Sequence, residues 1–168
     1  MLLNVIFMAV IVGLDQWTKY LTVEHIKPIG TLPIIPDVFH LTYVENRGAA
    51  FSILQGKRIF FVLLTLAVVA VILVLLYRKA KGEPLLRVSL VMIAGGAIGN
   101  LIDRLVLGYV VDMVDLRIIN YAIFNVADCF VVVGTILLAV YILFFDRVLL
   151  GDRKKEQNEQ SETGEKDG

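Results

Sequence analysis

Four apolar stretches of the chain are each long enough to cross a lipid bilayer. They cover residues 2–21, 59–77, 88–107 and 121–145. A bilayer core about 30 Å thick needs about 20 mainly apolar residues per helix, so each stretch predicts a transmembrane helix. The first stretch has no basic region before it and carries Asp15 and Lys19. It therefore predicts a retained helix rather than a cleaved secretory signal.

The segment between the first two helices has a different periodicity. Residues 39–44 alternate between the two faces of an extended chain, which predicts a strand. Residues 46–48 supply turn chemistry, and residues 49–54 are expected to return as a second strand. The predicted fold is an all-α membrane protein with four transmembrane helices and a small extracytoplasmic β structure, over about residues 28–57, between helices 1 and 2.

Basic residues indicate how the helices are oriented. They concentrate in the connector between the second and third spans, residues 78–87, and after the fourth span. The positive-inside bias makes both regions cytoplasmic, so both termini are expected inside and residues 22–58 and 108–120 outside. Residues 1–150 would form the membrane domain. The charged, almost entirely polar residues 151–168 are expected to be a disordered cytoplasmic tail.

Composition narrows the class further. Of the 168 residues 58% are hydrophobic and only 19% are charged, and the formal net charge is zero. A nucleic-acid partner is not expected, because binding phosphates requires a basic face. The single cysteine excludes an internal disulfide framework and a zinc site built from several thiolates. No cluster has metal-ligand spacing, so neither a metal nor another cofactor is expected.

Several polar side chains lie inside or at the ends of the predicted spans. An ionisable group there is costly and is a functional candidate by default. The alternative is an internal salt bridge or hydrogen bond that packs the helices, as between Asp15 and Lys19 or between Asp103 and Arg104. For Asn125 and Asp128 the alternative is a helix-capping box. Helical spacing puts each of these groups on one helix face: Asp15 and Lys19; Asn100, Asp103 and Arg104; Asn125 and Asp128.

Two aspartates are expected at the same depth on adjacent elements. Asp112 follows Arg104 by eight residues and should lie at or just beyond the outer end of the third helix, level with Asp128. Two carboxylates that share a site titrate apart, so that one is ionised while the other keeps its proton. The ionised carboxylate can take a proton from water while the protonated carboxyl group donates to a carbonyl. This is general acid–base peptide hydrolysis. Cys129 points about 100° around the helix from Asp128, which favours a buried structural thiol.

Five blocks of residues carry a further signal: DQWTK at 15–19, ENRGAAF at 45–51, GGAIGNLIDR at 95–104, GYVVD at 108–112 and FNVAD at 124–128. Together they resemble the signature blocks of bacterial lipoprotein signal peptidase, also called signal peptidase II. The resemblance covers residues 1 to about 146 in order and spacing. Met113 is one departure, because the family usually has phenylalanine after the aspartate that corresponds to Asp112.

The resemblance implies an intramembrane aspartyl endopeptidase with four helices and an outer β-cradle. Such enzymes remove the signal peptide of prolipoproteins immediately before the cysteine that carries a diacylglyceryl group. The resemblance assigns the catalytic pair to Asp112 and Asp128. It assigns supporting roles, as scaffold or substrate contacts, to Asp15, Lys19, Asn46, Gly48, Asn100, Asp103, Arg104 and Asn125.

The same resemblance implies partners and a location. The partners are a lipidated prolipoprotein, membrane lipid and inhibitors of the globomycin type, which are cyclic peptides. The location is the bacterial cytoplasmic membrane, with the active site near its outer face. We expect a monomer.

Two other functions compete with a peptidase. In a small transporter or helix-bundle chaperone the same charges would form a proton or ion relay. The chain lacks the inverted repeat that many transporter folds have. A lipid-modifying acyltransferase would pair Asp128 with His40, but no motif surrounds His40.

Overall fold

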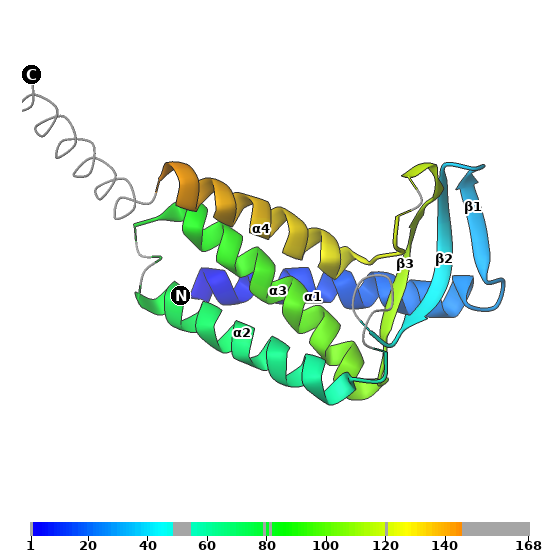
Figure 1. Ribbon diagram of the computed structural model, residues 1–168, viewed down its shortest axis with the longest axis horizontal. Coiled ribbons are helices and arrows are strands. Elements are labelled where there is room, and N and C mark those ends of the chain that lie inside the picture. The colour runs from blue at the N-terminus through cyan, green and yellow to red at the C-terminus, as the bar shows by residue number, and fades with distance from the viewer. Residues whose placement is uncertain (1, 49–54, 79, 81, 120, 146–168) are drawn as a thin grey trace, which may run out of the picture.

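The computed structural model describes residues 2–48, 55–78, 80, 82–119 and 121–145. Within these ranges four helices are long and apolar enough to cross a membrane, which confirms the four predicted spans. They form a bundle whose one end carries a small sheet (Figure 1). The helices are α1 (Leu2–Leu21), α2 (Arg58–Arg78), α3 (Pro84–Val106) and α4 (Val126–Phe144).

The sheet joins the two segments that were expected on the outer side. Strands β1 (Thr31–Ile35), β2 (Phe39–Asn46) and β3 (Val110–Leu116) pair in the order β1-β2-β3, with both pairs antiparallel. The β structure expected between the first two helices is confirmed. Strand β3, which lies between α3 and α4, was not predicted. Its first four residues are all buried, so its sequence lacks the alternation of apolar and polar residues that predicts a strand. The second strand expected at residues 49–54, like the tail at 151–168, lies outside the described residues.

Helix α4 begins at Val126, so the predicted start at residue 121 is wrong. Asn125 caps the helix: its side chain accepts a hydrogen bond from the Asp128 backbone, and the Asp128 side chain accepts one from the Asn125 backbone. Just before the cap, Phe124 forms a β-bridge with Val114. The apolar residues 121–124 continue the hydropathy of the helix but lie outside it.

Helix α3 packs against the other three helices, and glycines let two of them come close. A Cβ atom at Gly99 would lie 2.6 Å from Oδ2 of Asp15 on α1, and one at Gly96 would overlap the Ala127 carbonyl oxygen on α4. Small residues at such contacts allow helix backbones to approach. Polar side chains on α1, α3 and α4 therefore meet directly inside the bundle.

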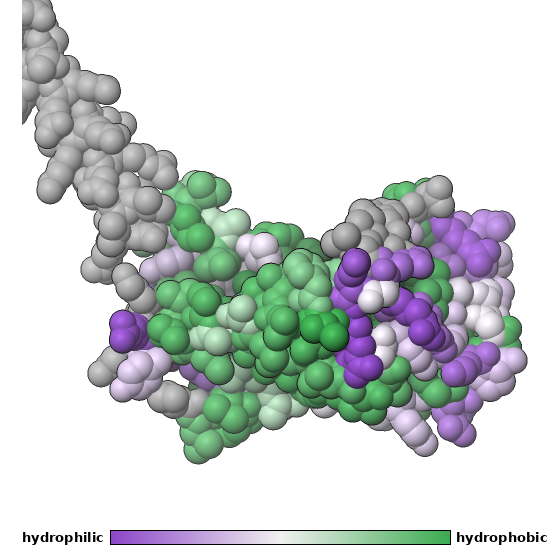
Figure 2. All heavy atoms as spheres, turned by 60° about the horizontal axis from the view of Figure 1, so that its bottom comes forward, coloured by the Kyte–Doolittle hydropathy of each residue, from purple (hydrophilic) through white to green (hydrophobic). Residues whose placement is uncertain are grey.

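The outside of the helical bundle is apolar. Figure 2 shows hydrophobic side chains over the helices and hydrophilic ones gathered around the sheet. Large apolar side chains on α2 and α4 stand in the open, including Leu63 (61% exposed) and Phe144 (66% exposed). A surface of this kind is stable in lipid rather than in water. The protein is therefore a multi-pass membrane protein, with its sheet at one end of the spans.

Candidate active site

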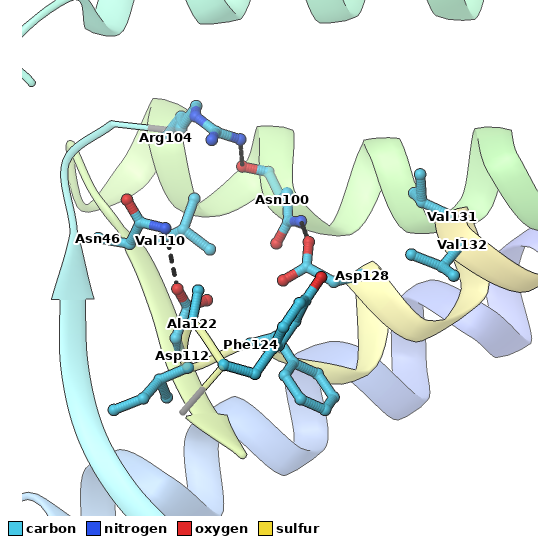
Figure 3. Close-up of a pocket in the computed structure, with 12 residues that line it drawn as sticks. Asn46, Asn100, Arg104, Val110, Asp112, Ala122, Phe124, Asp128, Val131 and Val132 are labelled. Atoms are coloured by element: carbon cyan, nitrogen blue, oxygen red, sulfur yellow. Dashed lines mark hydrogen bonds between the residues drawn. The ribbon is translucent and has the colours of Figure 1, made fainter. Parts of the chain in front are cut away.

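A cavity of about 220 Å³ lies where the sheet meets α3 and α4. In Figure 3, Asp112 enters it from β3 and Asp128 from the first turn of α4. The two aspartates that were expected to share a site therefore line the same cavity. Its remaining lining combines polar groups with an apolar wall: Asn46, Asn100, Arg104, Val110, Tyr121, Ala122, Ile123, Phe124, Val131 and Val132.

Asp112 is almost completely enclosed, with 1% of its surface exposed. Both of its oxygens accept hydrogen bonds, Oδ2 from Asn46 Nδ2 at 2.9 Å and Oδ1 from Asn125 Nδ2 at 2.6 Å. Asp112 lies on β3, outside the membrane-spanning helices. Burial raises its pKa to about 6, and the charge of Asp128 acts in the same direction, while the two asparagine hydrogen bonds oppose the rise. Asp112 therefore keeps its proton to a higher pH than an ordinary aspartate.

Asp128 has two roles at once. Its Oδ2 accepts from the Asn125 backbone N–H at 3.2 Å and closes the capping box. Its Oδ1 accepts from Asn100 Nδ2 at 2.8 Å and faces the cavity. The capping interpretation and the functional one, which the sequence left as alternatives, are therefore compatible.

Two asparagine side chains connect the aspartates. Asn125, which is fully buried, donates through Nδ2 to Asp112 and also to Oδ1 of Asn100 at 3.1 Å. Asn100 in turn donates to Asp128. An amide that accepts at its oxygen and donates at its nitrogen has a fixed orientation. The network therefore fixes the positions of both carboxyl groups relative to each other.

A buried ion cluster around Lys19 is hydrogen-bonded to this network through Asn100. Lys19 Nζ lies 2.8 Å from Asp15 Oδ2 and 3.0 Å from Asp103 Oδ2, and it donates to Asn100 Oδ1 at 2.9 Å. The predicted Asp15–Lys19 pair is confirmed. The alternative pair of Asp103 with Arg104 is wrong, because Asp103 turns toward α1 and pairs with Lys19.

The same cluster also binds backbone groups of the surrounding elements. Asp15 Oδ1 accepts from the Ala127 N–H at 2.9 Å, and Asp103 Oδ2 accepts from the Val111 N–H at 3.0 Å. Gln16, which was not among the predicted site residues, donates to Asp103 Oδ1 at 2.8 Å. Gln16 is a polar residue inside an apolar span and stands in the DQWTK block, but neither signal indicates that it contacts Asp103. The cluster thus attaches the start of α4 and the strand of Asp112 to α1 and α3.

Arg104 on α3 and Asn46 at the end of β2 both line the cavity, and both are hydrogen-bonded to Gly48. Arg104 donates to the Gly48 carbonyl at 3.2 Å and to the Asn100 carbonyl at 3.4 Å. Asn46 Oδ1 accepts from the Gly48 N–H at 2.9 Å, which leaves Asn46 Nδ2 directed at Asp112. All ten residues singled out from the sequence therefore belong to the cavity or to the hydrogen-bonded groups around it.

A family model described as signal peptidase II matches residues 7–144 of the chain. The chain belongs to the signal peptidase II family. Its relatives include the lipoprotein signal peptidase of Caldanaerobacter subterraneus subsp. tengcongensis, which is 51% identical over 83% of this chain and 95% of the relative. The lipoprotein signal peptidase of Clostridioides difficile is 44% identical over 86% of this chain and 97% of the relative.

Solved structures agree with the family assignment. Two structures of bacterial membrane enzymes are similar, one with a TM-score of 0.78 and 31% identity over 85% of this chain and 88% of that one. The other has a TM-score of 0.77 and 33% identity over 87% of this chain and 95% of that one. As a member of the signal peptidase II family, the protein is a membrane-embedded protease.

Cys129 and His40 are two further candidates for chemistry, and both lie outside the polar network of the cavity. Cys129 is exposed on α4, so the expectation of a buried thiol is wrong. The reason is that α4 buries few side chains, namely Ala127, Gly134 and Tyr141, and its other faces lie open. His40 lies opposite Asp115 in the sheet and does not line the cavity. The structure therefore does not bring His40 together with Asp128, as an acyltransferase would need.

Proposed function

We propose that this member of the signal peptidase II family is an aspartyl endopeptidase that cleaves lipid-modified prolipoproteins immediately before the lipidated cysteine. The observation that carries the proposal is the meeting of Asp112 and Asp128 in one cavity, each held by asparagine donors. Relatives that bear the name lipoprotein signal peptidase support the choice of substrate. The lipid would lie against the apolar part of the cavity wall, which includes Val131 and Val132 of α4.

In the proposed mechanism the two aspartates divide the acid and base roles. Asp112, the more buried, holds the proton, and Asp128 is ionised. Asp128 removes a proton from water, and the water oxygen forms a bond to the scissile carbonyl carbon while Asp112 donates its proton to the carbonyl oxygen. The resulting tetrahedral intermediate then breaks its C–N bond. The leaving amine takes the proton from Asp128, and a hydroxyl proton of the intermediate returns to Asp112.

The proposed orientation places this cavity at the outer face of the cytoplasmic membrane and both termini inside. The end of α2 at Arg78 and the first turn of α3 with Arg87 lie at the end of the bundle away from the sheet (Figure 1), and positive charge favours the cytoplasmic side. A peptide bond just outside the apolar layer would then reach the aspartates without leaving the interface. We further propose that residues 1–150 form the membrane domain.

The lipid specificity can be tested with matched precursors. A prolipoprotein carrying the diacylglyceryl group should be cleaved at least about tenfold faster, in kcat/KM, than the same chain without it. Each buried methylene contributes about 0.8 kcal/mol, so burial of only two already corresponds to about this factor. Initial rates with both precursors in detergent micelles give the ratio. Asp128→Asn protein serves as the control for contaminating proteases. Equal rates would contradict lipid recognition and would leave the acid–base assignment standing.

Because Asp112 is assigned as the acid, replacing its partner Asn46 should change the pH dependence of cleavage. Its hydrogen bond stabilises the ionised form of Asp112, so Asn46→Ala should raise the pKa of Asp112 above about 6. The acid would then keep its proton to higher pH, and the basic limb of the kcat/KM profile should move to higher pH. Tyr43→Phe is the control, because Tyr43 is on the same strand and its hydroxyl bonds to Glu45 instead. A shift of the acidic limb would mean that the two aspartates exchange roles.

A further inference from the structure

The helical bundle has a second cavity on a face that does not include the aspartates. It is a groove of about 400 Å³ between α1, α3 and α4, and it shares no lining residue with the cavity of Asp112. Its walls are almost entirely apolar, with Val10 and Leu14 from α1, Val91 from α3 and Phe130 from α4. A groove of this kind inside the apolar belt faces lipid rather than water.

One end of this groove is polar and positively charged. Asn4 and Arg87 line it there, each in the first turn of its helix. Figure 1 places the beginnings of α1 and α3 at the end of the bundle away from the sheet. Helix N-termini carry partial positive charge, which adds to that of the guanidinium. Arg87 donates to the Ala80 carbonyl at 3.1 Å and has no acidic partner within the described residues.

The length of the groove matches one leaflet of a bilayer. Its lining on α1 extends from Leu3 to Leu14. At 1.5 Å per residue this is about 17 Å. Half of an apolar core about 30 Å thick is about 15 Å. A transmembrane helix with side chains is about 10 Å or more in diameter and would cross both leaflets, so it fits the groove less well than an acyl chain does.

We propose that this groove is a binding site for one anionic phospholipid. An acyl chain lies along the apolar walls, and the phosphate group is held at Arg87 with Asn4 beside it. The chemistry that selects the ligand is the negative charge at one end of a single leaflet-length chain. The site is independent of the proposed peptidase chemistry, and a lipid bound there would act as a wedge that stabilises the contact of α1 with α3 and α4.

Native mass spectrometry of the full-length protein tests this proposal, with phosphatidylglycerol and phosphatidylcholine of identical acyl chains as probes. The wild type should retain one phosphatidylglycerol molecule in preference to phosphatidylcholine. Arg87→Gln should weaken phosphatidylglycerol binding at least about fivefold, and Arg87→Lys should retain most of it, because the charge is kept. Arg78→Gln is the matched control, since Arg78 ends α2 and does not line the groove.

A second pair of variants tests the acyl chain. Val10→Trp should fill the groove and abolish retention of the lipid, whereas Val5→Trp, equally exposed on α1 but outside the lining, should not. If Val10→Trp does not fold, Val88→Trp on α3 fills the same space. All variants should cleave substrate at the wild-type rate in detergent, because both aspartates lie in the other cavity. Equal retention of the two lipids, or unchanged binding in Arg87→Gln, would overturn the proposal.

Discussion

Replacing either Asp112 or Asp128 with asparagine should lower the rate of cleavage at least about a thousandfold. An asparagine has nearly the same volume and keeps a carbonyl oxygen for the surrounding donors, but it can neither remove a proton from water nor give one to a carbonyl. General acid or base catalysis contributes about 10² to 10⁴ in rate, and each substitution removes one of the two carboxyl groups that transfer protons in the proposed mechanism. Single-turnover cleavage of a lipidated precursor measures the loss, and far-UV circular dichroism checks that the helices remain.

Two neighbouring residues provide matched controls. Asp115 lies on the same strand as Asp112 but bonds to Thr42 and Arg117 and does not line the cavity, so Asp115→Asn should cleave at close to the wild-type rate. Cys129→Ala, one residue after Asp128 on α4, should do the same. A chelator should leave the rate unchanged. Substantial turnover by Asp112→Asn or Asp128→Asn, with controls intact, would contradict the acid–base pair.

The sequence contains most of the information on the helices, because lipid demands long apolar runs. It placed α1 correctly to the residue and α2 to within one residue at each end. Helix α3, however, begins at Pro84 rather than at residue 88, and α4 begins at Val126 rather than at residue 121. There the apolar residues 121–124 continue the hydrophobic pattern, and only the Asn125 cap ends it. Hydropathy does not distinguish an apolar segment that lies before a helix from the first turn of that helix. The cap signature was present in the sequence but did not decide between the two.

Contacts between helices were harder to predict than contacts along one helix. Spacing put Asp103 and Arg104 on the same face and offered them as a pair, yet Asp103 binds Lys19 on α1. Which partner is chosen depends on how closely the helices approach, and here Gly99 allows α1 to come against α3. Strand β3 is a similar case, because only its pairing with β2 shows that Asp112 is on a strand. The motifs identified the residues of the site, while the packing determined their partners.

The ion cluster around Lys19 leads to the second large effect. Lys19→Met should lower the free energy of unfolding by about 3–5 kcal/mol, because it leaves two buried carboxylates, Asp15 and Asp103, without their counter-ion. Methionine keeps most of the length of the side chain, so the change reports charge rather than lost volume. Reversible unfolding in detergent, followed by circular dichroism, measures the difference. Lys27→Met is the control, since Lys27 is 46% exposed and lies 3.7 Å from Glu45, where a pair contributes at most about 1 kcal/mol.

A second substitution separates the charge of Lys19 from its hydrogen bond to Asn100. Lys19→Met combined with Asp103→Asn removes one of the unpaired carboxylates, so it should recover part of the lost stability. It should not recover cleavage, because Asn100 Oδ1 still lacks the Lys19 donor that helps to orient its Nδ2 toward Asp128. The folded fraction of both variants should therefore show a lower kcat than wild type. If the double variant cleaved at the wild-type rate, Lys19 would only balance charge, and the orientation of Asn100 would depend on Asn125 alone.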